Sequence, residues 1–439
     1  MEVFSDSILS ETTKQNYMKI KRIKVEGLFH IFTHELIFNE NVTIIMGENG
    51  VGKTVTLNLI DAIFNARFDI LMGIDFSKIT VTFLHETWII ERSVKTKDND
   101  DLTYLVITTS KKGTSSFKID SEMLLPRLPS YLQRIDSNTW YNIRTNSYYN
   151  NHTVYERYGM YAKKKEYVIP SWYRNQMDKN RVKMIRTQRL ISSVNTGEGQ
   201  SFLTVNVYSN DLAKQIQDEI SIAGLYGADL DRSFPVRLMK HMKGHKNYSS
   251  SEIFNDLREL EVYRHQLSGV GLLSETEQNT FDDELTSALD KLNETMLSVM
   301  HLYVKDSWEK LRKYDSIYKK LSVLNDIINT RFKHKRFSID SRKGFVFQPE
   351  EELSKEIPLE KLSSGEQNEL VLFYELLFKC DSKDLILIDE PEISLHLTWL
   401  QAMIGDFKRI TKENGASLLI ATHSPDFIGD NYELVQNLG

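Results

Sequence analysis

One short loop has the residue types and spacing of a phosphate-binding site. Residues 47–54 read Gly-Glu-Asn-Gly-Val-Gly-Lys-Thr, which satisfies the pattern G-x-x-x-x-G-K-[ST]. Glycines let backbone N–H groups close around phosphates, a lysine reaches the β and γ oxygens, and a threonine hydroxyl can ligate Mg²⁺. We therefore expect ATP and Mg²⁺ to bind here, with the metal on Thr54. The residues expected to contact the nucleotide are Gly47, Asn49, Gly50, Gly52, Lys53 and Thr54.

The flanking sequence supplies the elements that this chemistry needs. Residues 42–46 are apolar and β-branched, which is typical of a buried strand, and residues 54–66 repeat apolar side chains at helical spacing. A helix that begins at the loop adds the positive end of its dipole to the phosphate site. Strand, loop and helix together favour a phosphate site over a glycine-rich turn that binds nothing.

Two adjacent carboxylates follow a second apolar run, residues 385–388. Asp389 and Glu390 stand at the C-terminal end of this expected strand, where ligands bind in open α/β sheets. We expect Asp389 to hold Mg²⁺ through the second coordination shell and Glu390 to polarise an attacking water. An acidic turn after a strand is also a common solubility device, so the assignment depends on the segment about 20 residues upstream.

That upstream segment, residues 363–367, reads Ser-Ser-Gly-Glu-Gln and combines a helix cap with an anion site. Ser363 followed by Glu366 fits a capping box that opens a helix running to about residue 378. The free N–H groups of such a helix start also suit a γ-phosphate. We therefore expect both roles at once, with Ser364 and Gly365 in contact with nucleotide.

A histidine ends the next apolar run along the chain. His423 follows residues 417–421, which predict another short strand. A lone histidine is usually an ordinary surface or core residue. At the C-terminal end of a strand in a phosphate-binding protein, however, it is placed to face the γ-phosphate.

In this order the motifs resemble an ABC-type ATPase head of the SMC/RecF/OLD-like branch. The resemblance implies a homodimer or higher homo-oligomer in which two ATP molecules lie between Walker A of one subunit and the signature of the other. It assigns residues 47–54 to Walker A, Ser364 and Gly365 to the signature, Asp389 and Glu390 to Walker B, and His423 to the switch.

Two positions of the resemblance are less regular. Related heads place a glutamine on Mg²⁺ and the attacking water, and Gln188, in the strand-like run 182–190, is the candidate. The alternative is an ordinary solvated glutamine. His396 stands where transporters usually carry an aspartate in the D-loop, which leaves signalling through that loop open.

The composition bounds the class of protein. The chain has 439 residues, 41% of them hydrophobic, which is enough for one large or two modest domains. Its single cysteine, Cys380, cannot form an intrachain disulfide. No signal peptide is recognisable and no run approaches 18 apolar residues, so we expect a cytoplasmic protein that does not span a membrane. The net charge of −6 does not by itself indicate a nucleic-acid-binding surface.

The expected fold class is α/β: a P-loop NTPase head of the ABC type, with a mixed sheet, an antiparallel β layer and a largely helical insertion. Strands of the antiparallel layer are expected at residues 79–83, 88–92 and 102–107. We expect a flexible N-terminal tail, the N-terminal half of the head, a mostly helical insertion and the C-terminal half of the head, over residues 1–16, 17–124, 125–330 and 331–439 respectively. Residues 337–347 predict a hairpin that returns the chain to the sheet.

Within the insertion, helices are expected at residues 205–222, 251–266 and 275–324. Their apolar stripes fit core packing, or else a face on which a partner docks. Residues 157–189 contain ten Lys or Arg and two Asp or Glu, interleaved with tyrosines and a tryptophan. This segment suits contact with nucleic acid or an acidic protein, and a solvated basic face is the alternative.

Two functions follow from the resemblance. Heads of this size with a helical insertion resemble ATPases of bacterial antiphage systems of the Septu, retron-associated and PARIS types, which implies control of a separate effector nuclease. No second acidic metal cluster is evident in the sequence, so we place any nuclease on another chain. The alternative is a RecF/SMC-like clamp that binds DNA through residues 157–189, for which DNA would stimulate ATPase activity without a partner. A transporter subunit is disfavoured.

Overall fold

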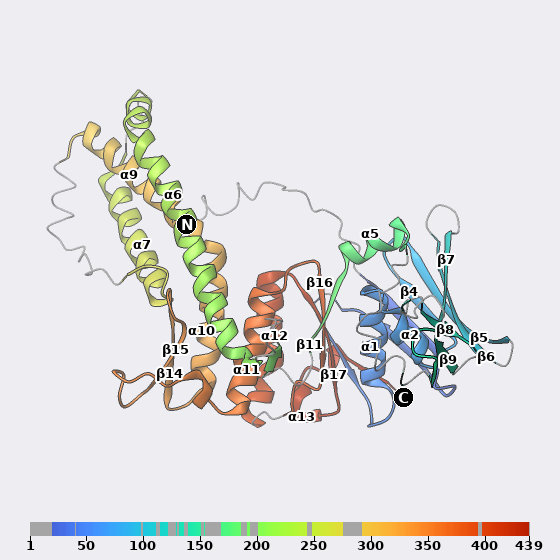
Figure 1. Cartoon of the computed structure of the whole chain (residues 1–439). Helices are drawn as coiled ribbons and strands as arrows, with labels where there is room; N and C mark the ends of the chain where they lie inside the picture. Colours follow the sequence, from blue (N-terminus) through green and yellow to red (C-terminus); the bar gives the residue numbers. More distant parts are fainter. Residues whose placement is uncertain are drawn as a thin grey trace. The chain divides into compact units, whose positions relative to one another are not determined.

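The computed structural model (Figure 1) describes most of the chain. The described residues are 20–39, 41–97, 100–110, 115–121, 129, 131–135, 139–150, 153, 168–185, 191–193, 201–243, 248–274, 292–393 and 397–438. The chain forms two compact units. The first comprises residues 1–187, 380–393 and 400–439, and the second comprises residues 188–379 and 394–399.

The centre of the first unit is a parallel sheet. Its strands lie in the order β11 (Arg181–Ile185), β16 (Asp384–Asp389), β17 (Ser417–Thr422), β3 (Val42–Met46) and β18 (Val435–Asn437), and each neighbouring pair is parallel. The middle strands are almost continuously apolar and buried, as a sheet covered on both faces requires. Because the strands are parallel, β3, β16 and β17 all end at the same edge.

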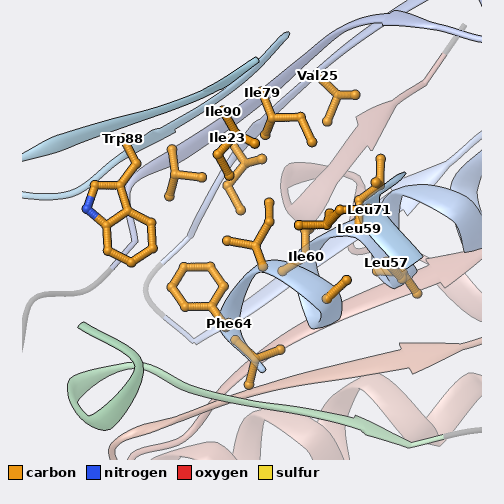
Figure 2. Packing of buried hydrophobic residues seen from close by; sticks show 14 of the residues in the cluster. Ile23, Val25, Leu57, Leu59, Ile60, Phe64, Leu71, Ile79, Trp88 and Ile90 are labelled. Atoms are coloured by element: carbon orange, nitrogen blue, oxygen red, sulfur yellow. The ribbon is translucent and has the colours of Figure 1, made fainter. Parts of the chain in front are cut away.

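A six-stranded antiparallel sheet forms the second layer of this unit. Its order is β2 (Phe32–Ile37), β1 (Arg22–Leu28), β4 (Lys78–Thr82), β5 (Thr87–Lys97), β6 (Asp100–Thr109) and β7 (Ser115–Asp120). Buried residues alternate along β1 and β4, so one face of the sheet is apolar. Figure 2 shows Ile23, Ile79 and Ile90 of this face gathered with Ile60 and Phe64 in one core cluster.

Helix α1 (Lys53–Phe64) lies between the two sheets in the packing. It contributes Leu57, Ile60 and Phe64 to the core cluster and also contacts β11, β16 and β17 of the parallel sheet. Nine of its residues are buried, which fits a helix covered on more than one side. This packing fixes the start of α1, and with it the loop that precedes the helix.

Smaller elements complete the first unit. They are α2 (Phe68–Gly73), the three-stranded sheet of β8 (Leu132–Arg134), β9 (Thr139–Asn142) and β10 (Ser147–Asn150), α5 (Ser171–Lys179), α13 (Pro425–Ile428) and η4 (Tyr432–Leu434). Helix α12 (Leu397–Asn414) lies mostly in this unit. Tyr173 of α5 is 0% exposed and stacks on Trp88 with ring centroids 4.6 Å apart.

The second unit is largely helical. Helix α9 (Glu294–Leu311) packs against both α6 (Thr204–Met242) and α7 (Ser250–Gly269), as Figure 1 shows. The remaining elements are β12 (Ile191–Ser193), β13 (Ser201–Leu203), η2 (Arg312–Tyr314), α10 (Asp315–Arg331), β14 (Lys335–Asp340), β15 (Gly344–Pro349), η3 (Leu359–Lys361) and α11 (Ser364–Phe378). In the described part of the chain, no helix has the length and apolar content needed to cross a bilayer.

The predicted fold class, an α/β P-loop head with an antiparallel layer and a helical insertion, is confirmed. Two details differ. The hairpin β14–β15 forms its own two-stranded sheet and does not join either larger sheet. Residues 181–185, expected in the insertion, form β11 of the core sheet, because their apolar side chains extend the buried face beside β16. The expected tail, residues 1–16, and residues 275–291 of the third expected helix lie outside the described residues.

Candidate nucleotide site

The loop between β3 and α1 has a backbone that only glycine adopts without strain. Gly50 and Gly52 both have φ of +91°. A Cβ at Gly47 would lie 2.5 Å from the backbone oxygen of Leu438, which follows β18. No side chain caps the start of α1 at Gly52, so the first N–H groups of the helix keep no side-chain partner there. These N–H groups can bind an anion.

Lys53 is folded back over this loop. Its Nζ donates to the backbone oxygens of Gly47 at 2.6 Å and of Glu48 at 3.0 Å, and the residue is only 6% exposed. An ammonium group has three donors, so these two bonds fix the side chain and leave one N–H for a phosphate oxygen. Lys53 is thus positioned by the same loop that would wrap the phosphates.

Thr54 lies beside the end of β16. Its Oγ1 donates to Oδ1 of Asp389 at 3.2 Å. The parallel register of β16, β17 and β3 brings residues 335 positions apart to the same sheet edge. A hydroxyl and a carboxylate are the oxygen ligands that a hard cation such as Mg²⁺ prefers.

The environment of Asp389 disfavours the charged form of its carboxyl. Burial raises the pKa of its carboxyl, and the neighbouring charge of Glu390 raises it further, against the Thr54 hydrogen bond and the Lys53 charge. A divalent cation beside this carboxylate would offset the desolvation of the charged form. The electrostatics of the site therefore fit a bound metal.

Glu390 and His423 meet at the ends of adjacent strands. Glu390 has φ of +46°, an uncommon conformation for a non-glycine residue, and its N–H donates to the oxygen of Ala421 at 2.9 Å. His423 follows β17, and its Nδ1 lies 3.3 Å from Oε1 of Glu390. The expected base and the expected switch residue are thus neighbours.

An open cavity of about 670 Å³ lies at this edge. It is large enough for a nucleoside triphosphate by the volumes usual for ligand pockets. Its lining combines the loop with His423 and the C-terminal strand: Met46, Gly47, Glu48, Asn49, Val51, His423, Asn437 and Leu438.

The capping box predicted at residues 363–366 is present in the second unit. Ser363 Oγ accepts from the backbone N–H of Glu366, and the Glu366 carboxylate accepts from the N–H of Ser363 at 2.8 Å. Lys335 donates to both oxygens of that carboxylate, at 2.6 and 2.8 Å. Burial opposes ionisation of Glu366, but the bonds from Lys335 and Ser363 outweigh it and lower its pKa. Ser364 and Gly365 form the first turn of α11.

The structure brings together most of the predicted residues. Thr54, Asp389, Glu390 and His423 lie with the glycine loop in the first unit, whereas Ser364 and Gly365 belong to the second. Gln188 and His396 lie outside the described residues, so their predicted roles stay predictions.

Three residues that contribute to the site were not predicted from the sequence. Glu392 accepts from Thr422 Oγ1 at 2.5 Å, and its Oε1 lies 3.5 Å from Nδ1 of His423. His34 Nε2 lies 2.7 Å from the Val51 oxygen and so braces the loop; burial lowers the pKa of His34. Leu438 covers Gly47. Only Glu392 had a signal in the sequence, as a second carboxylate in the Asp-Glu-Pro-Glu turn.

The basic segment 157–189 is described from residue 168 to residue 185. In that part, Tyr173 is in the core and cannot stack on a base. Arg181 and Lys183 pair with the buried carboxylate of Asp384 at 2.8 Å each. These side chains stabilise the fold, because the ring of Tyr173 is packed in the core and the two cations are paired with Asp384. The predicted nucleic-acid contact therefore concerns the segment's residues outside the described part and its exposed Arg174 and Lys179.

Comparisons with known proteins agree with a nucleotide site. A family model described as "AAA ATPase domain" matches residues 18–428. No curated protein sequence matches the chain.

Solved structures similar to the chain include SMC head domains. One is the Smc head domain from Pyrococcus furiosus, solved with an extended coiled coil and bound to the C-terminal domain of ScpA: 12% identity, 93% of this chain and 90% of that chain covered, TM-score 0.36. Another is the SMC head domain from Thermotoga maritima, with 12% identity, 96% and 94% coverage and TM-score 0.31.

Proposed function

The chain belongs to the AAA ATPase domain family, and on that premise we propose that it binds and hydrolyses ATP with Mg²⁺ at the edge of its parallel sheet. The single observation that carries this proposal is the pairing of Thr54 with Asp389 directly beside the glycine loop and Lys53. Hydrogen-bond donors for phosphate, a pair of oxygens suited to a cation and a carboxylate base are thereby close to one another. A structural turn would need none of these.

Each residue has a distinct proposed task. The loop N–H groups and Lys53 bind the β and γ phosphates, because they are fixed donors at a helix start. Thr54 would hold Mg²⁺ directly and Asp389 through the second shell; when bound, the metal neutralises charge on the phosphate oxygens. Glu390 polarises the attacking water, and His423 contacts the γ-phosphate. Gln188 is proposed as a further contact to the metal and the water.

We place the second half of each site on another subunit. Ser364 and Gly365 begin α11 with the capping box intact, which leaves helix N–H groups to bind a neighbour's γ-phosphate. The function then requires a homodimer or higher homo-oligomer that closes on two ATP molecules. Support for this step comes from the resemblance of residues 47–54, 364–365 and 389–390 to the motifs of ABC-type heads.

The proposal is tested with purified protein and Mg·ATP. Lys53→Ala should abolish nucleotide binding, since the phosphates lose the cation that the loop holds in place. Glu390→Gln should retain binding, slow hydrolysis by about 100-fold or more and accumulate a closed dimer, because only the water-polarising group is lost. Lys24→Ala, which removes a partly buried lysine paired with Glu26 at 2.7 Å, is the matched control. Turnover by Glu390→Gln at the wild-type rate would remove Glu390 from the mechanism.

We further propose that the ATPase cycle controls a separate effector, a nuclease, in bacterial antiphage defence in the cytoplasm. The support is the resemblance of a head with a helical unit to Septu-type, retron-associated and PARIS-type ATPases. Phage plating on cells that carry the native operon, with either the wild-type chain or Lys53→Ala, tests this role. Equal plating on both strains would contradict it.

A further inference from the structure

A second glutamate, Glu392, lies next to the Glu390–His423 pair. Glu392 is two residues after Glu390, and its side chain is only 7% exposed. Its Oε1 accepts from the hydroxyl of Thr422 at 2.5 Å and from the N–H of His423 at 3.3 Å, and it lies 3.5 Å from Nδ1 of the His423 ring. One carboxylate oxygen, Oε1, therefore lies close to the Thr422 hydroxyl, the His423 backbone N–H and the His423 ring.

The other oxygen of this carboxylate is difficult to explain by stability. Glu392 Oε2 is buried and has no hydrogen-bond partner among the residues that the structure describes. A buried unsatisfied polar atom typically costs about 1–3 kcal/mol, and more when the group is charged. A smaller, neutral side chain at position 392 would be enough to accept the hydrogen bond from the Thr422 hydroxyl and hold the turn. The carboxylate therefore points to a role beyond holding the turn.

One ring nitrogen of His423 lies near two carboxylates. Its Nδ1 is 3.3 Å from Glu390 and 3.5 Å from Glu392, and the imidazole is 45% exposed toward the cavity. A ring nitrogen that faces two acceptors carries the proton, which leaves Nε2 as the atom available to the opposite side. With Glu392 present, His423 can turn away from Glu390 and still have an acceptor for Nδ1–H.

We propose that Glu392 is a positioning residue that acts through His423. It holds the Nδ1–H tautomer of the histidine, presents Nε2 to the γ-phosphate, and takes over Nδ1–H so that Glu390 is free to polarise water. This inference rests on the proposed ATPase function. It assigns to Glu392 an effect on turnover and little effect on nucleotide affinity.

The first test is a double-mutant cycle measured by steady-state hydrolysis. Glu392→Gln, which is nearly isosteric, should lower kcat by about 10–100-fold, the usual effect of losing a supporting carboxylate, with KM changed by less than about threefold. In a His423→Ala background the same substitution should change kcat by less than about twofold, because its target is gone. An equal loss in both backgrounds would overturn the proposal.

A matched control separates positioning from a structural cap. Thr422→Val removes the hydroxyl that donates to Glu392 and accepts from the Ser424 N–H at 3.0 Å, but it leaves the carboxylate beside the histidine. If Glu392 acts through His423, this variant should keep kcat within about threefold of wild type; if it is merely a cap, Thr422→Val should reproduce the Glu392→Gln loss.

The second test does not depend on activity. In protein labelled with ¹⁵N at histidine, the His423 signals are identified by their absence from His423→Ala. Wild type should show a protonated Nδ1. Glu392→Gln should shift the ring toward the Nε2–H tautomer. Glu392→Asp, which keeps the charge, is measured as the second variant in case the Glu392→Gln protein fails to fold. Unchanged His423 signals in both variants would refute the positioning role. A wild type that turns over no ATP would instead refute the proposed function, and the ¹⁵N result would still decide this one.

Discussion

At the residue scale, the site is built from charged groups that the protein itself leaves poorly compensated. Asp389 is the clearest case, since burial and the charge of Glu390 raise the pKa of its carboxyl. The buried carboxylate of Glu392, with one oxygen unpartnered among the described residues, is another. Such groups are expected where a cation or a reacting phosphate completes the environment.

Asp389→Asn should change the pH dependence of stability. A folded-state pKa raised above the ordinary value of 3.8 means that the folded protein binds the proton more tightly than the unfolded chain. The stabilisation is then complete below the unfolded pKa and is lost as pH rises through the folded pKa. Asp389→Asn should therefore unfold at higher urea than wild type at pH 7, and this advantage should disappear at pH values below about 4.

The same variant should bind Mg·ATP about 10–100-fold more weakly, the usual consequence of losing a second-shell metal partner. Asp229→Asn, at an exposed surface pair, serves as the control for both measurements. Equal urea midpoints of Asp389→Asn and wild type at pH 7 would show that the carboxylate carries no desolvation cost.

At the element scale, close backbone approaches fix how helices meet strands. In the second unit, Ser209 of α6 donates to the Lys343 oxygen at 2.8 Å and accepts from the Phe345 N–H at 2.8 Å. Gly344 lies between them with φ of +80°, and a Cβ there would lie 2.0 Å from the Ser209 backbone oxygen. This junction admits no side chain.

Gly344→Ala is therefore expected to lower the melting temperature by several degrees, because α6 and β15 must separate and the positive φ adds strain of about 1 kcal/mol or more. Gly405→Ala is the matched control. Gly405 lies inside α12 with open space around it, so a methyl group there should stabilise the helix by about 0.5–1 kcal/mol. Thermal melts of the two variants should move in opposite directions.

Helices α10 and α11 are joined by a buried ion pair. Arg331 and Glu369 are 4% and 0% exposed, and Arg331 also donates to the backbone oxygen of Trp399 at 3.3 Å. Arg331→Met should cost about 3–5 kcal/mol of unfolding free energy, because it leaves the Glu369 charge buried without its cation.

A variant that also carries Glu369→Leu should recover much of that loss, since no buried charge remains. The control is Arg232→Met, which breaks an exposed pair (82% and 69%) and should cost less than about 1 kcal/mol. A loss for Arg331→Met no larger than for Arg232→Met, measured by urea unfolding, would contradict the assigned role of the pair.

At the scale of the whole molecule, the proposed composite site predicts complementation between two inactive variants. Lys53→Ala lacks the phosphate lysine and Ser364→Arg blocks the signature, so each alone should hydrolyse no ATP above background. A mixed dimer has one site with an intact glycine loop from one subunit and an intact α11 start from the other.

Mixing equal amounts should therefore restore measurable hydrolysis, up to about a quarter of the wild-type rate if half of the dimers are mixed and each has one working site. Two Lys53→Ala preparations mixed together are the control. A mixture that stays inactive while native mass spectrometry detects mixed dimers would argue against shared sites, and normal hydrolysis by Ser364→Arg alone would do so directly.

Local patterns in the sequence predicted the candidate site residues and most of the helices and strands. Three of these local patterns are the glycine loop, the capping box at Ser363 and the Asp389–Glu390 pair. Each can be recognised from the types and spacing of neighbouring residues. The apolar runs of β3, β16 and β17 likewise predicted buried strands, because a short apolar run is recognisable without knowledge of its partner strands.

Which distant groups meet could be seen only once the chain was folded. The 3.2 Å contact of Thr54 with Asp389, the approach of His423 Nδ1 to both Glu390 and Glu392, and the position of Leu438 over Gly47 all depend on the register of parallel strands. The structure likewise showed that Tyr173 and Arg181 of the basic segment serve the core and an ion pair. Register and burial arise from packing between segments hundreds of residues apart, and no local spacing encodes them.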